Sequence, residues 1–250
     1  MKVISVYNFK GGIGKSTISA PLADGLSRIG KKVLMSNLDG QNNSLHFLTG
    51  YIGEYEKTLY DLIVPENKPT LEETLIRMSE DFQIYGLASS EIQDINSDPW
   101  VLPTIEKLLK EAEALGFDYV IFDCSPQESK LNMAALYYSD AVLMPVQLQY
   151  SSVEAINLTY KYFTKNKLDV NKIKIIVPNM LDKRTAHSRN CLSALKDVLY
   201  KDNPEILAEP IPQRTSITDA GQEGVSIFDY DPVAAEPFFN LVKKVVTVIG

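Results

Sequence analysis

Short apolar runs alternate with amphipathic stretches along almost the whole chain. The apolar runs predict strands at Lys2–Tyr7, Val33–Leu38, Phe82–Leu87, Tyr119–Asp123, Ala141–Val146, Ile173–Val177 and Ile206–Ala208. Stretches with helical spacing predict helices near Lys15–Gly30, Pro99–Leu115, Leu131–Ser139, Val153–Asn166, Ala186–Lys201 and Ala234–Val248. This alternation is typical of an α/β fold with a mostly parallel twisted sheet and helices on both faces. The pattern is weak from Tyr51 to Met78, where we expect short helices and loops.

A glycine-rich run separates the first predicted strand from the first predicted helix. It reads Lys10-Gly11-Gly12-Ile13-Gly14-Lys15-Ser16-Thr17. A glycine loop in this position lets backbone N–H groups and a helix N-terminus bind phosphate. We expect Lys15 to contact the β- and γ-phosphates of a nucleotide and Ser16 to bind Mg²⁺. A glycine-rich turn without a ligand is the alternative, but it would place Lys10 and Lys15 in a tight turn with no anion to neutralise them.

Two predicted strands end beside acidic residues that suit a magnesium site. The run Tyr119–Asp123 ends in Asp123, which we expect to support Mg²⁺ through water, unless it only caps the following helix. The polar loop after Val33–Leu38 holds Asp39, which is the candidate for orienting an attacking water, unless it is only a turn residue. Because ligands of parallel sheets bind at the carboxyl ends of the strands, both acids are expected near the glycine loop.

Composition narrows the class of protein. The 250 residues suit one large α/β domain, and 45% apolar residues are enough for a substantial core. The net charge of −7 excludes a basic field over the whole surface. Residues 151–202 nevertheless hold ten basic and five acidic side chains, the basic ones being Lys161, Lys165, Lys167, Lys172, Lys174, Lys183, Arg184, Arg189, Lys196 and Lys201. This segment is either a nucleic-acid-binding surface or a solvated helix face.

The spacing of the two cysteines favours a reducing cytoplasm. Cys124 and Cys191 form neither a disulfide framework nor a metal-ligand spacing. We expect no signal peptide, and no apolar run approaches the ~20 residues of a membrane span.

Four segments resemble the ParA/MinD family of deviant Walker A ATPases, most of all its ParA (Soj) partition branch. Lys10–Thr17 matches the family's phosphate loop, in which the additional lysine is the hallmark; Phe9 stands where the strict pattern has glycine. Val33–Asn43 is similar to the segment usually written Asp-x-Asp-Pro-Gln-Gly-Asn. Asp118–Pro126 is similar to the family's Walker B strand, and Asp140–Gln147 resembles the strand that follows it.

The resemblance implies a fold, cofactors and an assembly. It implies one P-loop ATPase domain over residues 1–250, without an N-terminal helix-turn-helix domain. It implies ATP and Mg²⁺ as cofactors, with Asn179 and Pro212 beside the adenine. An ATP-sandwich homodimer is expected, in which Lys10 reaches the phosphates of the other copy. The phosphates are expected to lie against Gly11, Gly12, Ile13, Gly14, Lys15, Ser16 and Thr17.

The resemblance also implies partners. Dimers of the family bind DNA without sequence preference, and a centromere-bound ParB-like adaptor stimulates hydrolysis, so a cytoplasmic, nucleoid-associated protein is expected. Close relatives carry arginines in the segment that matches residues 212–216, where this chain has Arg214 as its one basic residue and Ser216 where an arginine is common. We therefore expect DNA contacts from Arg184, Arg189 and Arg214, together with lysines of the basic segment.

Departures from the family leave two alternatives open. Asn37 stands where the family has the first acid of its Asp-x-Asp, and Gly40 replaces the proline. Loss of a charge beside Mg²⁺ predicts slow hydrolysis or weaker magnesium binding, so one alternative is an ATP-binding switch that hardly hydrolyses ATP. The other is a MinD-like positioning ATPase at a membrane. Phe238–Val246 could form an amphipathic surface helix, but its polar face offers only two lysines, which favours core packing.

Overall fold

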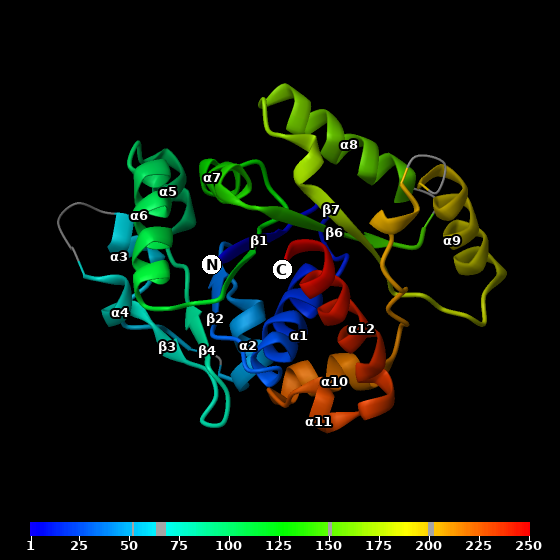
Figure 1. Ribbon diagram of the computed structural model, residues 1–250, viewed down its shortest axis with the longest axis horizontal. Coiled ribbons are helices and arrows are strands. Elements are labelled where there is room, and N and C mark those ends of the chain that lie inside the picture. Colours follow the sequence, from blue (N-terminus) through cyan, green and yellow to red (C-terminus); the bar gives the residue numbers. More distant parts are fainter. Residues whose placement is uncertain (52, 64–68, 150–151, 200–202) are drawn as a thin grey trace.

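The computed structural model describes residues 1–51, 53–63, 69–149, 152–199 and 203–250. Within these ranges seven strands form one sheet, in the order β3-β4-β2-β5-β1-β6-β7 (Figure 1). Neighbouring strands are parallel, except that β3 pairs antiparallel with β4. The strands are β1 (Lys2–Val6), β2 (Val33–Asn37), β3 (Ile76–Arg77), β4 (Ile84–Leu87), β5 (Tyr119–Asp123), β6 (Ala141–Gln147) and β7 (Ile173–Asn179). The predicted α/β fold with a mostly parallel sheet is confirmed.

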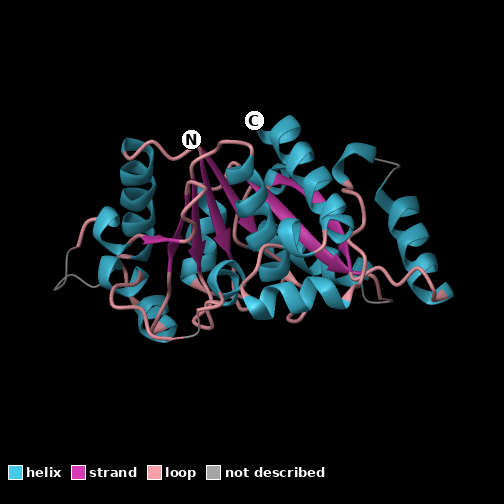
Figure 2. Cartoon of the chain, turned by 90° about the horizontal axis from the view of Figure 1, so that it is seen from below, coloured by secondary structure: helices cyan, strands magenta, loops and turns pink. Residues whose placement is uncertain are grey.

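Helices cover both faces of this sheet (Figures 1 and 2). One face is packed by α1 (Lys15–Arg28), α2 (Asn43–Thr49), α10 (Thr215–Glu223), α11 (Ile227–Tyr230) and α12 (Pro232–Ile249). The other is packed by α6 (Val101–Ala114), α7 (Lys130–Tyr138), α8 (Ser152–Lys165) and α9 (Ala186–Leu199). Shorter helices complete the fold, namely α3 (Leu59–Ile63), α4 (Leu71–Thr74), α5 (Ile92–Ser97) and the 3₁₀ helices η1 (Val170–Lys172) and η2 (Pro204–Ile206). The central strands, whose side chains are buried, therefore pack between two layers of helices.

One predicted strand is wrong. Ile206–Ala208 follows the 3₁₀ helix η2, and only Leu207 forms a bridge, to Ile176 of β7. The run is apolar because its side chains are buried beside the edge of the sheet, and not because it extends the ladder. Strand β3 was not predicted, since two residues are too few to show a period of two.

The six predicted helices all form, and their described ends agree with prediction to within two residues. The predicted end at Lys201 lies outside the described residues. Between Tyr51 and Met78 the described residues form α3, α4 and the start of the β3–β4 pair, while residues 52 and 64–68 of this stretch are outside the description. Helices α2, α5, α10 and α11 were not predicted because they are short and begin in polar loops.

The C-terminal helix belongs to the core. A Cβ added to Gly25 of α1 would lie 2.6 Å from a methyl carbon of Val242, so α1 and α12 pack closely at this point. Phe238, Leu241 and Val245 are buried in the same layer. This packing uses the apolar face that could otherwise have met a membrane surface. Among the described residues, no helix combines the length and the apolar character that crossing a membrane requires.

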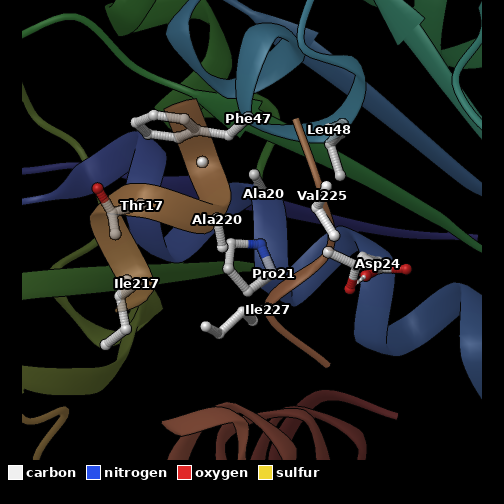
Figure 3. A pocket seen from close by; sticks show the side chains of 12 residues that line it. Thr17, Ala20, Pro21, Asp24, Phe47, Leu48, Ile217, Ala220, Val225 and Ile227 are labelled. Atoms are coloured by element: carbon white, nitrogen blue, oxygen red, sulfur yellow. Dashed lines mark hydrogen bonds between the residues drawn. The ribbon is translucent and has the colours of Figure 1, made fainter. Parts of the chain in front are cut away.

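Helix α2 packs directly against α10 (Figure 3). The ring of Phe47 lies where a Cβ on Gly221 would be, only 2.5 Å from it. A cavity of about 30 Å³ remains between these helices and α1, and its lining includes Ala20, Pro21, Leu48, Ile217 and Ala220. At its edge the buried Asp24 accepts hydrogen bonds from Ser226 and Arg28. Since α2 begins directly after the loop that holds Asp39, this loop is connected to α10 by packed side chains.

Candidate functional site

The carboxyl ends of β1, β2, β5 and β7 bring the predicted site residues to one edge of the sheet. The glycine-rich loop connects β1 to α1, and Gly14 is the N-cap residue of that helix. Gly12 and Gly14 adopt φ angles of +71° and +85°, in the left-handed region that favours glycine. The loop therefore turns directly into a helix N-terminus, which is the geometry that directs backbone N–H groups toward an anion.

Two buried asparagines fasten this loop to neighbouring strands. Asn8 donates to the carbonyl of Pro145 in β6 at 2.7 Å, and its Oδ1 accepts from the N–H of Lys10 at 3.2 Å. Asn179, the last residue of β7, donates to the carbonyl of Ile13 at 2.7 Å. Both side chains are almost fully excluded from solvent. The loop is thus held from both ends by hydrogen bonds in a low-dielectric setting, where each bond is stronger than in water.

The side chain of Lys15 lies along the inside of the loop. Its ammonium donates to the carbonyls of Asn8 at 3.3 Å and Lys10 at 3.2 Å. The residue is only 8% exposed. Burial lowers the pKa of Lys15, and the negative charge of Asp123 opposes this shift. A buried cation held by carbonyl dipoles at a helix N-terminus is suited to an anionic ligand.

Hydroxyl groups surround the carboxylate of Asp123 at the end of β5. Ser16 donates to one carboxylate oxygen at 2.7 Å, and Ser19, one helical turn later, donates to the other at 3.0 Å. Burial raises the pKa of Asp123, while these hydrogen bonds and the Ser44 hydroxyl favour the ionised form. A hydroxyl and a carboxylate in contact are hard oxygen ligands of the kind that Mg²⁺ prefers. The residues present therefore fit a magnesium ion.

Asn37 lies beside Asp123, and its side chain forms hydrogen bonds with Ser44 and with the backbone of Asp39. The two residues are register partners on adjacent strands. The Asn37 amide donates to Ser44 at 2.7 Å, and its Oδ1 accepts from the N–H of Asp39 at 2.7 Å. Its backbone carbonyl accepts from the Ser89 hydroxyl at 2.6 Å. The neutral side chain thus joins the start of α2 to the loop that holds Asp39.

Asp39 lies on a cavity of about 550 Å³. The loop after β5, residues Ser125, Pro126 and Gln127, lines the same cavity, as does Glu91. One Asp39 carboxylate oxygen accepts from the N–H of Gln41 at 3.2 Å. The structure therefore brings Asp39 and the loop after the Walker B strand together.

Phe9 and Lys10 occupy different environments at the start of the phosphate loop. The Phe9 ring packs edge-on against Tyr7 and Tyr162, with centroid distances of 5.5 and 4.7 Å. This cluster gives a packing reason for an aromatic residue where the strict pattern has glycine. The ammonium of Lys10 donates to the Gln149 side chain at 3.0 Å, on the solvent side of the loop.

The segments of Asn179 and Pro212 run side by side. Leu181 and Pro212 form a bridge, with the N–H of Leu181 donating to Ile211 at 3.0 Å. An adjoining cavity of about 530 Å³ is lined by Gln147 and Gln149 at the end of β6, by Met180 and Gln213 of the two segments, and by Ser188 of α9. The two predicted adenine residues are thus close in space, although the donor of Asn179 is used on the phosphate loop.

The three predicted DNA-binding arginines contact other segments than the phosphate loop among the described residues. Arg184 is 91% exposed in its side chain and pairs with Asp182 at 2.9 Å. Arg189 donates to the carbonyl of Lys183 at 2.6 Å from the first turn of α9. Arg214 precedes α10 and lies 4.0 Å from Asp231. Lys201 of the basic segment lies outside the described residues.

Sequence reasoning missed four polar residues that shape the site: Asn8, Ser19, Ser44 and Asn132. Ser19 could have been found, because it follows Ser16 by three residues and so shares its helix face. The asparagines show no such local signal, since their partners are not set by helical or strand spacing.

Comparisons with known proteins agree with this geometry. Residues 1–175 match the family model described as an AAA domain. Soj of Bacillus subtilis, a sporulation initiation inhibitor protein, is 30% identical over 98% of this chain and 98% of its own. The chromosome partitioning protein ParA of Caulobacter vibrioides is 23% identical over 99% of this chain and 94% of its own. A variant of Cyanothece McdA solved with ATP has the same fold, with a TM-score of 0.81, 20% identity and coverage of 100% and 98%.

The matched ranges contain the main members of the candidate site. The phosphate loop with its extra lysine, the buried acid at the end of β5 and the polar loop after β2 all lie within the matched ranges. Taken with the seven-stranded sheet that presents them at one edge, these similarities establish that the chain belongs to the ParA/MinD family of P-loop ATPases, in the group of Soj and ParA.

Proposed function

We propose that this chain is a DNA partition ATPase. It binds ATP with Mg²⁺, dimerises around the nucleotide, binds DNA without sequence preference, and hydrolyses ATP when a centromere-bound ParB-like partner stimulates it. The chromosome partitioning protein ParA and Soj support the assignment through similarity over almost the full chain. The main observation behind this proposal is that Lys15 and the hydrogen-bonded pair Ser16–Asp123 lie together at the N-terminus of α1.

The phosphate loop supplies the nucleotide contacts in this proposal. Lys15 exchanges its two carbonyl partners for phosphate oxygens, and the backbone N–H groups from Gly11 to Thr17 surround them. Asn179 and Pro212 border the adenine, which the cavity between their segments and the end of β6 can accommodate. Since Lys15 is already buried and charged, the phosphates gain a desolvated cation without rearranging the loop.

Ser16 and Asp123 hold magnesium in this proposal. The Ser16 hydroxyl is the direct ligand and Asp123 acts through water. When bound, the ion neutralises charge on the phosphates. Asp39 orients the attacking water from the cavity that it shares with Ser125 and Gln127. Hydrolysis then needs no covalent intermediate, because positioning and charge stabilisation carry the reaction.

Dimerisation and DNA binding use the exposed cations. Lys10 lies on the solvent side of the loop, bonded to Gln149, and it reaches the phosphates of a second copy in the sandwich dimer. Arg184, Arg189 and Arg214 form the proposed DNA contacts with lysines of the basic segment. Arg184 and Arg214 leave acidic partners to bind phosphate, so their contributions are smaller than those of unpaired cations.

Size-exclusion chromatography with light scattering tests the proposal. A nonhydrolysable ATP analogue should give a dimer, ADP a monomer, and only the dimer should shift with a random DNA duplex. DNA affinity should fall steeply between 50 and 200 mM salt, since only phosphate contacts are proposed. The same samples are mixed with anionic vesicles. An ATP-dependent shift onto vesicles without a shift onto DNA would instead favour a MinD-like positioning ATPase.

Asn37 favours a second candidate function, a switch that binds ATP and hardly hydrolyses it. Its neutral amide is committed to Ser44 and to the N–H of Asp39, so this position adds no charge beside Asp123. Single-turnover hydrolysis of radiolabelled ATP with DNA present separates the two candidates. Turnover that DNA or a partner strongly stimulates excludes the switch.

A further inference from the structure

The loop between β5 and α7 stands between the phosphate loop and Asp39. Ser125, Pro126 and Gln127 line the cavity that Asp39 also lines. On its other side Pro126 faces the glycine-rich loop, where a Cβ on Gly11 would come 4.0 Å from it. A small movement of this loop therefore changes the cavity in which water would be activated.

One side chain fixes this loop from behind. Asn132, in the first turn of α7, is fully buried. Its side-chain nitrogen lies 3.0 Å from the carbonyl of Ser125, 3.0 Å from the Ser125 hydroxyl and 2.7 Å from the carbonyl of Gln127. Its backbone N–H donates to the capping hydroxyl of Ser129 at 2.9 Å. The side-chain amide of Asn132 thus holds the loop against the beginning of α7.

The oxygen of that side-chain amide accepts no hydrogen bond from the described residues. The Oδ1 of Asn132 is buried and has no hydrogen-bond partner among the described residues. A leucine of similar size would remove this unsatisfied oxygen, but it would also leave the carbonyls of Ser125 and Gln127 without the donor of Asn132. The asparagine therefore acts on this loop through its donor, while its oxygen makes no hydrogen bond among the described residues. The loop that it holds lies on the cavity that Asp39 also lines.

We infer that Asn132 is a positioning residue for ATP hydrolysis. By holding Ser125 and Gln127 against α7, it keeps the loop at a fixed distance from the phosphate loop and from Asp39. It touches neither nucleotide nor water itself. This inference rests on the proposed ATPase activity, and it predicts that Asn132 affects the rate of the chemical step far more than the binding of ATP.

Two variants test the inference against a matched control. Asn132→Asp keeps the shape but replaces the donor with an acceptor that repels the two carbonyls. Asn132→Leu removes the donor and the unsatisfied oxygen together. The control is Asn166→Asp, because Asn166 also donates from a side-chain amide to a backbone carbonyl, that of Tyr162 at 2.9 Å, at the far end of α8.

Three measurements separate positioning from a structural role. Single-turnover hydrolysis of radiolabelled ATP should slow at least tenfold in both Asn132 variants, while the dissociation constant of ATP changes less than threefold. The control should stay within twofold of wild type in both. Thermal unfolding identifies the variants that fold. If Asn132→Asp does not fold, Asn132→Leu provides the test, because leucine brings no negative charge next to the two carbonyls.

Each result has a defined meaning. Folded Asn132 variants that hydrolyse ATP at the wild-type rate overturn the inference and leave the proposed function intact. Variants that lose ATP affinity as much as rate also overturn it, since the residue then supports the fold of the whole site. If wild type itself neither binds nor hydrolyses ATP, the proposed function fails instead.

Discussion

The amide nitrogen of Asn179 occupies the space into which a side chain at Gly14 would project. A Cβ at Gly14 would lie 2.3 Å from Nδ2 of Asn179, which donates at the same time to the carbonyl of Ile13. The last residue of β7 thus meets the phosphate loop at a position that has no room for a side chain. The need for glycine here comes from a contact between residues far apart in sequence as well as from backbone conformation.

Gly14→Ala should damage nucleotide binding more than backbone strain alone explains. The matched control is Gly30→Ala, because Gly30 has φ +84°, close to the +85° of Gly14, but no atom within 4 Å of an added Cβ. Strain alone costs about 1–2 kcal/mol in both variants. We expect ATP affinity to fall at least tenfold in Gly14→Ala and to stay unchanged in Gly30→Ala, as measured by isothermal titration calorimetry. Equal effects in the two variants would contradict the role of Asn179.

Lys15→Ala should abolish ATP binding without unfolding the protein. Among the described residues the buried ammonium of Lys15 donates to two carbonyls, and burial lowers its pKa, so the unliganded fold gains little from it. We expect the dissociation constant of ATP to rise at least a hundredfold and the thermal midpoint without nucleotide to stay the same or rise. Lys10→Ala is the companion variant and should still bind ATP but fail to dimerise. Tight ATP binding by Lys15→Ala would contradict the site.

Asp123→Asn should flatten the dependence of stability on pH. Burial raises the pKa of Asp123 above 3.8, so between pH 3.8 and the raised value the folded state binds more protons than the unfolded state. Stability from this group is therefore lost as pH rises through that window. We expect the variant without nucleotide to melt at the same or a higher temperature at pH 7, with a smaller slope above pH 4.

Two further readouts complete the Asp123 experiment. Mg²⁺ with ATP should stabilise wild type and no longer stabilise Asp123→Asn. Asp231→Asn is a control of opposite sign, because a hydrogen bond from Ser216 lowers the pKa of Asp231 and its contribution is lost as pH falls below 3.8. If wild type loses stability as pH falls below 3.8 and Asp123→Asn does not, the carboxylate is stabilised, and not penalised, in the folded state.

Asn37→Asp should lower the stability of the unliganded protein and strengthen magnesium binding. An acid at this position lies in register with Asp123 and can no longer donate to Ser44, so two buried carboxylates repel each other. A loss of about 2 kcal/mol lowers the melting temperature of a chain of this size by about 4–8 °C. We expect that loss without ligand, and a larger stabilisation by Mg²⁺ with ATP than in wild type. Calorimetric melts with and without Mg²⁺ decide it, and an unchanged magnesium response would contradict the placement of the ion.

The sequence by itself determined the fold class and the main members of the candidate site. Apolar runs of strand length alternating with helical spacing are local signals, and they are strong enough to predict the sheet and six helices. The glycine loop, Lys15 and Ser16 are contiguous, Asp123 is the last residue of one predicted strand, and Asp39 follows another. Because parallel strands place their carboxyl ends at one edge, residues distant in sequence could be expected to meet there.

Only the tertiary structure decided how these groups are held. Asn179 and Ile13 are 166 positions apart, and Asn8 and Pro145 are 137 apart, so no periodicity connects them. The same reason explains why helices α2 and α10 were missed and why a strand was wrongly predicted at Ile206–Ala208. Burial against distant elements outweighs weak local preference in these segments. Local patterns specify elements and strand ends; side-chain hydrogen bonds and close contacts that set a site's geometry form only when the chain has brought distant segments together.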